Sequence, residues 1–505
     1  TFNLLCHVPR SVHLLNKQSK QINALKKRLA QALSYEEWKG LSLELDELEG
    51  KAYWKLNAHS DIYNHDLLSD RFRELRGYRE SQDTEGLSRA LREGLHHDLG
   101  NMGDIRLYQK CYFGTKKLIE DYIDEVCECL RYLKNTPMDG LTPAGKLDFF
   151  KAILLSFGRP ALLLSGGASL GAFHIGVVKA LWEQDLLPQV INGSSSGAIV
   201  AAALGTHTDE ELPSLFDPAT HNQKAWRWLG LKSAMDGQGL MDQEQLSDYI
   251  EGFVGDYTMQ EAYERTGRSI NISVSPVQHH QKSRLLSGYT SPYILMSSAA
   301  LASSAVPGIF PPVKLMKKNV QGEHVPYMPR LRWVDGSVVS DLPIERLMHL
   351  YDVNYTVVSQ TNPHIVPFMG SARRNTNESR FMDLPLRWAK AQLKFHGKGI
   401  SDYIRKNSDW ELLRQVSGQA YSMMDQRYQG DVTVTPDYKL KHYAKVISNL
   451  TPDFVEELML EGQRATWPKV AMIRTHAQIS QTLETCIAEL KQNVRTHRAT
   501  LSVIA

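Results

Sequence analysis

The sequence predicts an α/β core placed between two mostly helical regions. Two strand–turn–helix units follow one another between residues 160 and 205, which is the pattern of parallel strands joined by crossover helices. On either side of this stretch, apolar residues recur with the period of amphipathic helices. The chain has 505 residues, 42% of them hydrophobic, so it can bury a sizeable core and is long enough for two to four domains.

The composition excludes several classes of protein. Lys and Arg number 58 and Asp and Glu 56, a net charge of +2, whereas a nucleic-acid binder would carry a strongly basic domain. Five cysteines in a chain of this length exclude a disulfide scaffold. Cys127 and Cys129 have no second pair at zinc-site spacing, so we expect core thiols and no structural metal.

Neither a membrane span nor a secretion signal is evident. No run of 18 apolar residues occurs, and the opening TFNLLCHVPR has neither an initiator Met nor the apolar region of a signal peptide. We therefore expect a cytoplasmic protein, and a peripheral association with membranes stays open.

The first region, residues 1–157, reads as a helical domain. Ser34 and Glu37 have the spacing of a capping box ahead of an apolar stripe. A second stripe runs from Leu118 to Leu133, and Thr142 followed by Pro143 predicts another helix start.

The α/β core is expected in residues 158–368. Its first unit is a strand at 160–165, a glycine-rich turn at 166–171 and a helix at 172–184; the second is a strand at 189–193, a turn at 194–197 and a helix at 198–205. Further strands are predicted at 268–277, 331–335 and 354–360. The third region, 369–505, is predicted to be mostly helical, with an interruption at 431–436.

Both turns match the nucleophile-elbow motif G-x-S-x-G, centred on Ser195 and on Ser169. Acyl transfer needs a nucleophile and a set of backbone N–H groups that bind an oxyanion, and two loops can supply one each. We favour Ser195 as the nucleophile, because the other loop has adjacent glycines whose N–H groups are unshielded. Two ordinary glycine turns remain the structural alternative.

The nucleophile needs a base. Histidine is the usual choice, but none of the candidates has a recognisable catalytic context; they are His174, His207, His221, His279, His280, His324 and His364. Asp335 ends an apolar strand, where α/β sites are built, and an aspartate bonded to a serine can accept its proton directly. On residue type alone, an aspartate there is more often a turn former. Nucleotide binding is disfavoured because neither G-x-G-x-x-G nor a P-loop is complete.

These motifs, in this order, resemble the patatin-like phospholipases. The resemblance rests on SGGASLGAFHIGVVKAL, GSSSGAIVAA, SPYILMSSAALASSAVPGIFPPV and VDGS, and covers about residues 160–365. It implies a three-layer α/β/α fold with a Ser–Asp dyad, no metal and no cofactor. It assigns Ser195 as nucleophile, Asp335 as base, and the backbone of Gly166, Gly167 and Ala168 as the oxyanion hole.

Three positions depart from the family pattern: Ser165 replaces an Asp, Ala168 a glycine, and Leu170 an Arg or Lys. The apolar Leu170 is similar to the branch of fungal-type triacylglycerol lipases and their bacterial relatives. Segments 34–55 and 461–474 also resemble the flanks of that branch, which has an N-terminal helical domain. Leu170 leaves open whether the substrate is a neutral lipid or a phospholipid.

The resemblance implies a serine lipid acyl hydrolase that cleaves glycerolipid esters through an acyl-enzyme. Two alternatives stay open, a lipid acyltransferase and an inactive lipid-surface binding protein. The expected partner is a glycerolipid at a membrane or lipid-droplet surface, without nucleic acid; a homo-oligomer stays open.

A basic segment at 373–406 is the candidate membrane contact. It holds nine basic and three acidic side chains, a net charge of +6. An apolar stripe with a cationic flank suits an anionic membrane, although the pattern slightly favours a solvated helix packed by its apolar face on the core. The residues assigned to this contact are Arg387, Trp388, Lys390, Lys394 and Lys398.

Overall fold

The computed structural model describes residues 10–138, 141–221, 224–230, 233, 239–278, 281–337, 341–363, 365–366 and 429–504. Its contacts divide the chain into two compact units. The helical unit comprises Thr1–Arg159 and Thr466–Ala505, and the sheet unit comprises Pro160–Ala465.

The helical unit contains helices throughout its described residues, as the apolar periodicity predicts. They are α1 (Arg10–Gln31), α2 (Tyr35–Leu48), α3 (Lys51–Leu56), α4 (His65–Glu80), α5 (Thr84–Gly94), η1 (Leu99–Asn101), α6 (Ile105–Gln109), α7 (Lys117–Asn135), α8 (Pro143–Phe157), η5 (Trp467–Lys469) and α23 (Val470–Ile504).

The predicted helix starts in this unit are confirmed. The Ser34 hydroxyl accepts a hydrogen bond from the Glu37 N–H at 3.2 Å, and Thr142 caps α8 with Pro143 in its first turn. The Glu37 carboxylate accepts from the N–H of Leu33, one residue before the expected partner. Cys127 and Cys129 are free, buried thiols on α7, as expected.

The sheet unit alternates strands and helices. In chain order its elements are β1 (Arg159–Leu164), η2 (Ala168–Gly171), α9 (Ala172–Trp182), β2 (Val190–Gly193), α10 (Ser196–Thr206), α11 (Leu212–Leu215), η3 (Pro218–His221), α13 (Gln243–Val254), α14 (Met259–Thr266), β3 (Ser269–Pro276), β4 (Arg284–Ser287), α15 (Met296–Ser304), β5 (Met316–Lys318), β6 (His324–Pro326), β7 (Trp333–Asp335), α17 (Ile344–Tyr351), β8 (Val353–Ser359), β9 (Val432–Val434), α21 (Leu440–Tyr443) and α22 (Pro452–Thr466).

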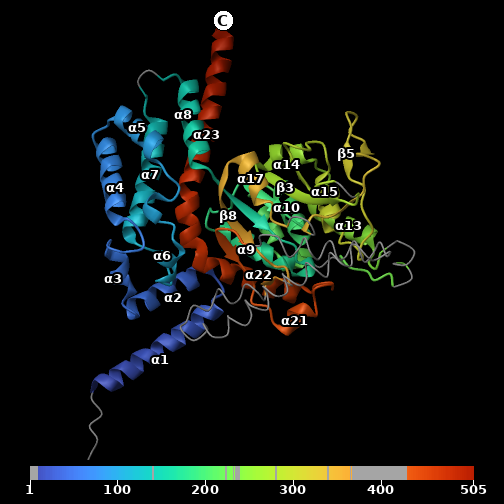
Figure 1. Cartoon of the computed structure of the whole chain (residues 1–505), viewed down its shortest axis with the longest axis horizontal. Coiled ribbons are helices and arrows are strands. Elements are labelled where there is room, and N and C mark those ends of the chain that lie inside the picture. Colours follow the sequence, from blue (N-terminus) through green and yellow to red (C-terminus); the bar gives the residue numbers. More distant parts are fainter. Residues whose placement is uncertain are drawn as a thin grey trace, which may run out of the picture. The chain divides into compact units, whose positions relative to one another are not determined.

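The main sheet has the order β4-β3-β2-β1-β8-β9, with β7 also paired to β3. Figure 1 labels two of its strands, β3 and β8. The pairs β1–β2, β2–β3 and β8–β9 are parallel, whereas β4 and β7 run antiparallel to β3. This mostly parallel sheet confirms the α/β prediction, and each predicted strand is present within two residues of its expected ends. The strands β4, β5 and β6 were not predicted.

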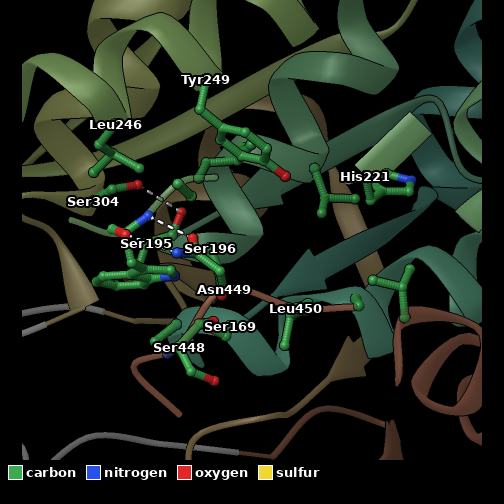
Figure 2. Close-up of a pocket in the computed structure, with 18 of the residues that line it drawn as sticks. Ser169, Ser195, Ser196, His221, Leu246, Tyr249, Ser304, Ser448, Asn449 and Leu450 are labelled. Carbon is green, nitrogen blue, oxygen red and sulfur yellow. Dashed lines mark hydrogen bonds between the residues drawn. The ribbon is translucent and has the colours of Figure 1, made fainter. Parts of the chain in front are cut away.

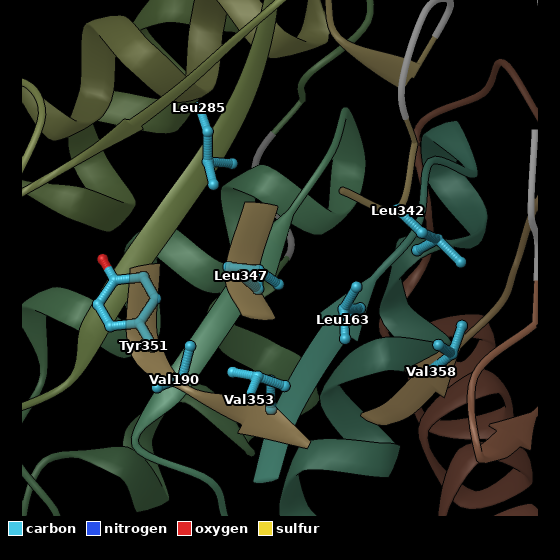
Figure 3. Packing of buried hydrophobic residues seen from close by; sticks show 9 residues of the cluster. Leu163, Val190, Leu285, Leu342, Leu347, Tyr351, Val353 and Val358 are labelled. Carbon is cyan, nitrogen blue, oxygen red and sulfur yellow. The ribbon is translucent and has the colours of Figure 1, made fainter. Parts of the chain in front are cut away.

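Helices cover both faces of the sheet. On one face α17 packs against alternate residues of β1, including Ala161 and Leu163, in a cluster of buried apolar side chains (Figure 3). Helix α9 lies between β1 and β2 in the chain, and α10 follows β2 on the way to β3. These three strands are parallel neighbours, and both connections step across the sheet in the same direction. Right-handed crossovers therefore place both helices together on the other face.

The structure divides the third predicted region, 369–505, between the two units. Strand β9 joins the edge of the main sheet beside β8, and α22 packs against α9. The two helices cross at glycines, because a Cβ on Gly176 would collide with the backbone of Met459 and one on Gly462 with that of Phe173. The residues from Thr466 onward belong to the helical unit.

Candidate functional site

Ser195 lies at a tight turn between β2 and α10. Its φ of 54° and ψ of −124° are unusual for a residue other than glycine and mark local strain. Both glycines of the motif are required by close packing, since a Cβ on Gly193 would meet Gly197 and Ala198, and one on Gly197 would meet Leu164. The Ser195 N–H donates to the Ser303 hydroxyl at 3.0 Å, which holds the turn against the end of α15.

The register of β3 brings Asp335 to this turn. Ile272 of β3 pairs with Gly193 of β2 and with β4, so β2 and β4 lie on opposite sides of β3. Val274 pairs with β4 and with Asp335 of β7. Strand β7 therefore lies on the same side of β3 as β2, just beyond the point where β2 ends, and it places Asp335 next to the Ser195 turn.

Asp335 is a buried carboxylate, with 1% of its surface exposed. Burial raises its pKa to about 6, and hydrogen bonding from the Ser337 backbone and side chain and from the Ser195 side chain opposes that rise in pKa. The Ser337 N–H donates to Oδ1 at 2.8 Å. At neutral pH the group is mostly ionised and can accept a proton.

The loop after β1 lies against the same turn. A Cβ on Gly166 would lie 3.3 Å from the Ser195 Cβ, a tight contact, whereas one on Gly167 would lie 2.9 Å from the Thr361 Cβ and would collide. Ala168 has a φ of 51°, in the left-handed region, and begins the short helix η2.

One of the three predicted oxyanion donors is already engaged. The Gly166 N–H donates to Oδ1 of Asp341 at 3.1 Å, so this group is not free to bind an oxyanion, and the prediction for Gly166 does not fit the geometry. Within the described ranges, no hydrogen-bond acceptor is found for the N–H groups of Gly167 and Ala168.

Asp341 was not predicted as a site residue. It is fully buried, and its other carboxylate oxygen accepts from Asn362 Nδ2 at 2.6 Å. Burial, together with the charge of Asp335, raises its pKa to about 7. Its carbonyl oxygen accepts from the Ser194 hydroxyl at 2.8 Å, so Asp341 contacts both loops of the site. The only sequence signal is its place six residues after Asp335.

His174 forms hydrogen bonds with the loop that follows β1 and with the end of β8. It is completely buried, and burial lowers its pKa to about 4, so the ring is neutral at neutral pH. Its Nε2 lies 2.9 Å from the Ser165 carbonyl, which can only accept, so this nitrogen carries the proton. Nδ1 then accepts from the Ser359 hydroxyl at 2.7 Å. This agrees with the interpretation of His174 as a satisfied buried histidine.

The side chain of Ser169, the competing serine, is engaged elsewhere. Its hydroxyl donates to the Ser448 carbonyl at 2.8 Å and accepts from the Ser448 N–H at 3.4 Å. Its backbone N–H donates to the Val446 carbonyl. Ser169 therefore ties the segment that follows α21 to the β1 loop.

The other described histidine candidates also have partners away from Ser195. His207 contacts the Ala203 carbonyl, His221 the Leu215 carbonyl and His324 the Asp256 carboxylate. His279, His280 and His364 lie outside the described residues. In the part of the chain that the structure describes, no three His, Cys, Asp or Glu side chains gather as metal ligands would.

Ser195 opens into a mostly apolar hollow of about 830 Å³, its mouth to solvent included. Figure 2 shows Ser195 and Ser196 between Leu246 and Tyr249 on one side and Ser169 and Ser448 on the other. The remaining walls are contributed by α9, α10 and the segment around Trp226 and Phe310. The shape and lining suit an apolar ligand whose reactive group reaches Ser195.

The residues assigned to the membrane contact, Arg387, Trp388, Lys390, Lys394 and Lys398, lie outside the described residues. Every helix within the described ranges is too short or too polar to cross a bilayer.

Two family models match this chain, one in the sheet unit and one in the helical unit. Residues 162–348 match the family model "Patatin-like phospholipase", and residues 15–154 match a domain of unknown function, DUF3336. A solved structure, VipD from Legionella pneumophila, covers 60% of this chain and 67% of its own at 13% identity and a TM-score of 0.28.

Curated relatives match almost the whole chain. "Triacylglycerol lipase 4" of Saccharomyces cerevisiae is 33% identical over 91% of this chain and 52% of its own length. "Triacylglycerol lipase SDP1L" of Arabidopsis thaliana is 34% identical over 93% and 59%. The chain thus spans little more than half the length of these two relatives. "Triacylglycerol lipase ptl3" of Schizosaccharomyces pombe is 34% identical over 90% of this chain and 95% of its own length. The chain belongs to the patatin-like phospholipase family.

Proposed function

We propose that this protein is a serine lipid acyl hydrolase that cleaves glycerolipid esters, with Ser195 as nucleophile and Asp335 as its base. The observation that carries the proposal is the interaction of the strained Ser195, which lines an apolar hollow, with the buried carboxylate of Asp335. Family membership and the names of the relatives support the same reaction class.

In the proposed reaction, Asp335 accepts the hydroxyl proton as the Ser195 oxygen attacks the ester carbonyl. The N–H groups of Gly167 and Ala168 stabilise the oxyanion that forms, and the positive end of the α10 dipole adds to that stabilisation. As the tetrahedral species collapses, the protonated Asp335 gives its proton to the leaving oxygen, so the alcohol departs and the acyl group stays on Ser195. Asp335, ionised again, then accepts a proton from the water that attacks the acyl-enzyme, and it returns that proton to the Ser195 oxygen as the fatty acid leaves.

We further propose that the substrate is a triacylglycerol or a phospholipid met at a lipid–water surface. The apolar lining of the hollow supports an acyl chain as the bound part. The four cysteines within the described ranges are free, the state expected in the reducing cytoplasm. We therefore propose that the protein acts in the cytoplasm and binds transiently to lipid surfaces.

Fluorophosphonate labelling tests the assignment of the nucleophile. The probe phosphonylates an activated serine, so it should label wild type and Ser169→Ala but not Ser195→Ala. Labelling that persists in Ser195→Ala and disappears in Ser169→Ala would reverse the assignment.

Product analysis tests the reaction. Purified wild type, incubated with triacylglycerol, phosphatidylcholine and lysophosphatidylcholine, should release fatty acid from at least one of them, and Asp335→Asn should release it at least about 10²-fold more slowly. Transfer of the acyl group to added lysolipid, without release of fatty acid, would replace the hydrolase by an acyltransferase. Lipid binding without any product would leave a surface-binding protein.

A further inference from the structure

A second, smaller hollow lies behind the one that contains Ser195. Its volume is about 380 Å³ with its opening to solvent included, and we call it the distal chamber. The two hollows share five lining side chains, one from α9, two from α10, one from η3 and one from α13: Ile175, Ile199, Val200, His221 and Tyr249. These shared residues lie between the two hollows, and we call them the throat.

Helix α10 lines the whole path. Ser195 and Ser196 at its start line the first hollow, Ile199 and Val200 one turn later line the throat, and Ala203 and Leu204 after a further turn line the distal chamber. From Ser195 to Ala203 the helix rises about 12 Å. An extended chain of roughly eight to ten carbon atoms covers that span, given carbon–carbon bonds of about 1.5 Å.

The distal chamber is apolar. The residues that line it without reaching the first hollow are all hydrophobic: Val178, Ala203, Leu204, Leu215, Phe216 and Phe253. At the throat, burial lowers the pKa of His221 and so disfavours its charged form, and its Nε2 lies 2.8 Å from the Leu215 carbonyl. The His221 and Phe253 rings lie 4.9 Å apart, and Tyr249 and Phe253 5.6 Å apart.

We propose that the distal chamber holds the methyl end of the acyl chain whose ester carbonyl is attacked by Ser195. The chain runs between α9 and α10, through the throat, and its first eight to ten carbons lie alongside α10. The distal chamber is then the part of the site that selects for chain length. This inference rests on the proposed function, since it assigns the acyl group to Ser195.

Two substitutions change the volume of the distal chamber in opposite directions. Ala203→Leu fills it from α10, and Phe253→Ala enlarges it. The assay is hydrolysis of p-nitrophenyl butanoate, octanoate, dodecanoate and hexadecanoate. Each methylene that loses its apolar site lowers kcat/KM about fourfold. We expect Ala203→Leu to lower kcat/KM at least about tenfold for dodecanoate and hexadecanoate and to leave butanoate within about twofold.

Phe253→Ala should shift the preference toward longer chains relative to wild type. Leu246 lines the first hollow only, so Leu246→Ala is the matched control and should affect octanoate as strongly as hexadecanoate. An unchanged ratio of hexadecanoate to butanoate in both chamber variants would overturn the inference. If Ala203→Leu does not fold, the result for Phe253→Ala decides.

A binding experiment separates this inference from the proposed function. Hexadecanoic acid with a diazirine on its terminal carbon is irradiated in the presence of the wild-type protein, and the modified peptides are mapped. Cross-links to the peptides that contain Leu215, Phe216 or Phe253 support the chamber even if no ester is hydrolysed. Cross-links confined to other peptides contradict it, even where hydrolysis proves the proposed function.

Discussion

The Gly166 N–H donates to the Asp341 carboxylate at 3.1 Å, across 175 residues of sequence. The glycine follows β1 and the aspartate follows β7, so this bond joins the two strand ends that bracket the candidate site. It leaves Gly167 and Ala168 as the donors of the loop that can face an oxyanion. Asp341 is thus a positioning residue for the loop.

The Asp341→Asn variant should change stability in a pH-dependent way. The pKa of Asp341 in the folded protein, about 7, is raised above the value of about 4 in the unfolded chain, so the folded state favours the protonated form. The contribution of protonated Asp341 to the stability of the folded state is fully present below pH 4 and is lost as the pH rises through 7. Asn has no charge to bury. The unfolding free energy of the variant, relative to that of wild type, should therefore rise by on the order of 4 kcal/mol between pH 4 and pH 8.

Urea unfolding at the two pH values measures this difference. At pH 4 the variant should be less stable than wild type by about 1 kcal/mol, because an amide cannot accept from both Gly166 and Asn362. The exposed Asp437 provides the control, since Asp437→Asn removes no buried charge. A stability difference for Asp341→Asn that does not change with pH contradicts the prediction.

The activity of wild type should fall in acid. In the proposed mechanism Asp335 must be ionised to accept the Ser195 proton, and its pKa is raised to about 6 by burial. For a soluble butanoate ester, kcat/KM should be constant above pH 7 and fall about tenfold per pH unit below 6. Asp335→Asn should lower kcat/KM by about 10²- to 10⁴-fold at pH 8. An acid limb in the same place in the residual activity of Asp335→Asn would assign the titration to another group.

Gly197 should tolerate no side chain. A Cβ there would lie 2.6 Å from the Leu164 carbonyl carbon and 2.7 Å from the Ser165 oxygen, so α10 would have to move away from β1. Gly197→Ala should cost about 1–3 kcal/mol of unfolding free energy and displace Ser195. In the matched variant Gly288→Ala, the added Cβ would come no closer than 3.6 Å to a neighbour. Thermal unfolding and fluorophosphonate labelling of both variants give the comparison.

Trp228 should contribute to the hydrolysis of substrate at a lipid surface. It is 59% exposed, two residues from Trp226, which lines the hollow and whose backbone exchanges two hydrogen bonds of 2.8 Å with the Asn449 side chain. Exposed tryptophans favour the bilayer interface. Trp228→Ala should lower hydrolysis of emulsified triacylglycerol several-fold and leave the soluble butanoate ester unchanged. Tyr263, 46% exposed on α14, is the control aromatic, and an equal effect of Tyr263→Ala would contradict a specific role for Trp228.

Local patterns predicted most of the sheet unit. The strands β1, β2 and β3 are short apolar runs bounded by turn residues, and the Ser195 turn has its motif in a contiguous segment. The edge strand β4 was missed because its four residues, RLLS, give too little alternation to indicate a strand. Asp341 was missed because its function depends on contacts with Gly166 and Asn362, which are far away in the sequence.

Contacts between residues distant in sequence also explain why the predicted C-terminal region, 369–505, is divided between the two units in the structure. The prediction that residues 369–505 are mostly helical covers α22, but the place of α22 against α9 depends on two glycines, Gly176 and Gly462, that are distant in sequence. The prediction for Gly166 failed for a related reason. A motif shows that an N–H group is unshielded, and only the fold shows which acceptor reaches it.

The pairing of β7 with β3 has a consequence for how the site is assembled. β7 contributes three residues, and its last, Asp335, faces Val274. A slip of one residue in this short ladder would turn the carboxylate to the opposite face of the sheet. During synthesis the Ser195 turn emerges long before β7, so the nascent chain carries Ser195 before Asp335 can reach it. Under the proposed mechanism, ester hydrolysis would begin only when β7 has paired in register, which makes activity a direct readout of that pairing.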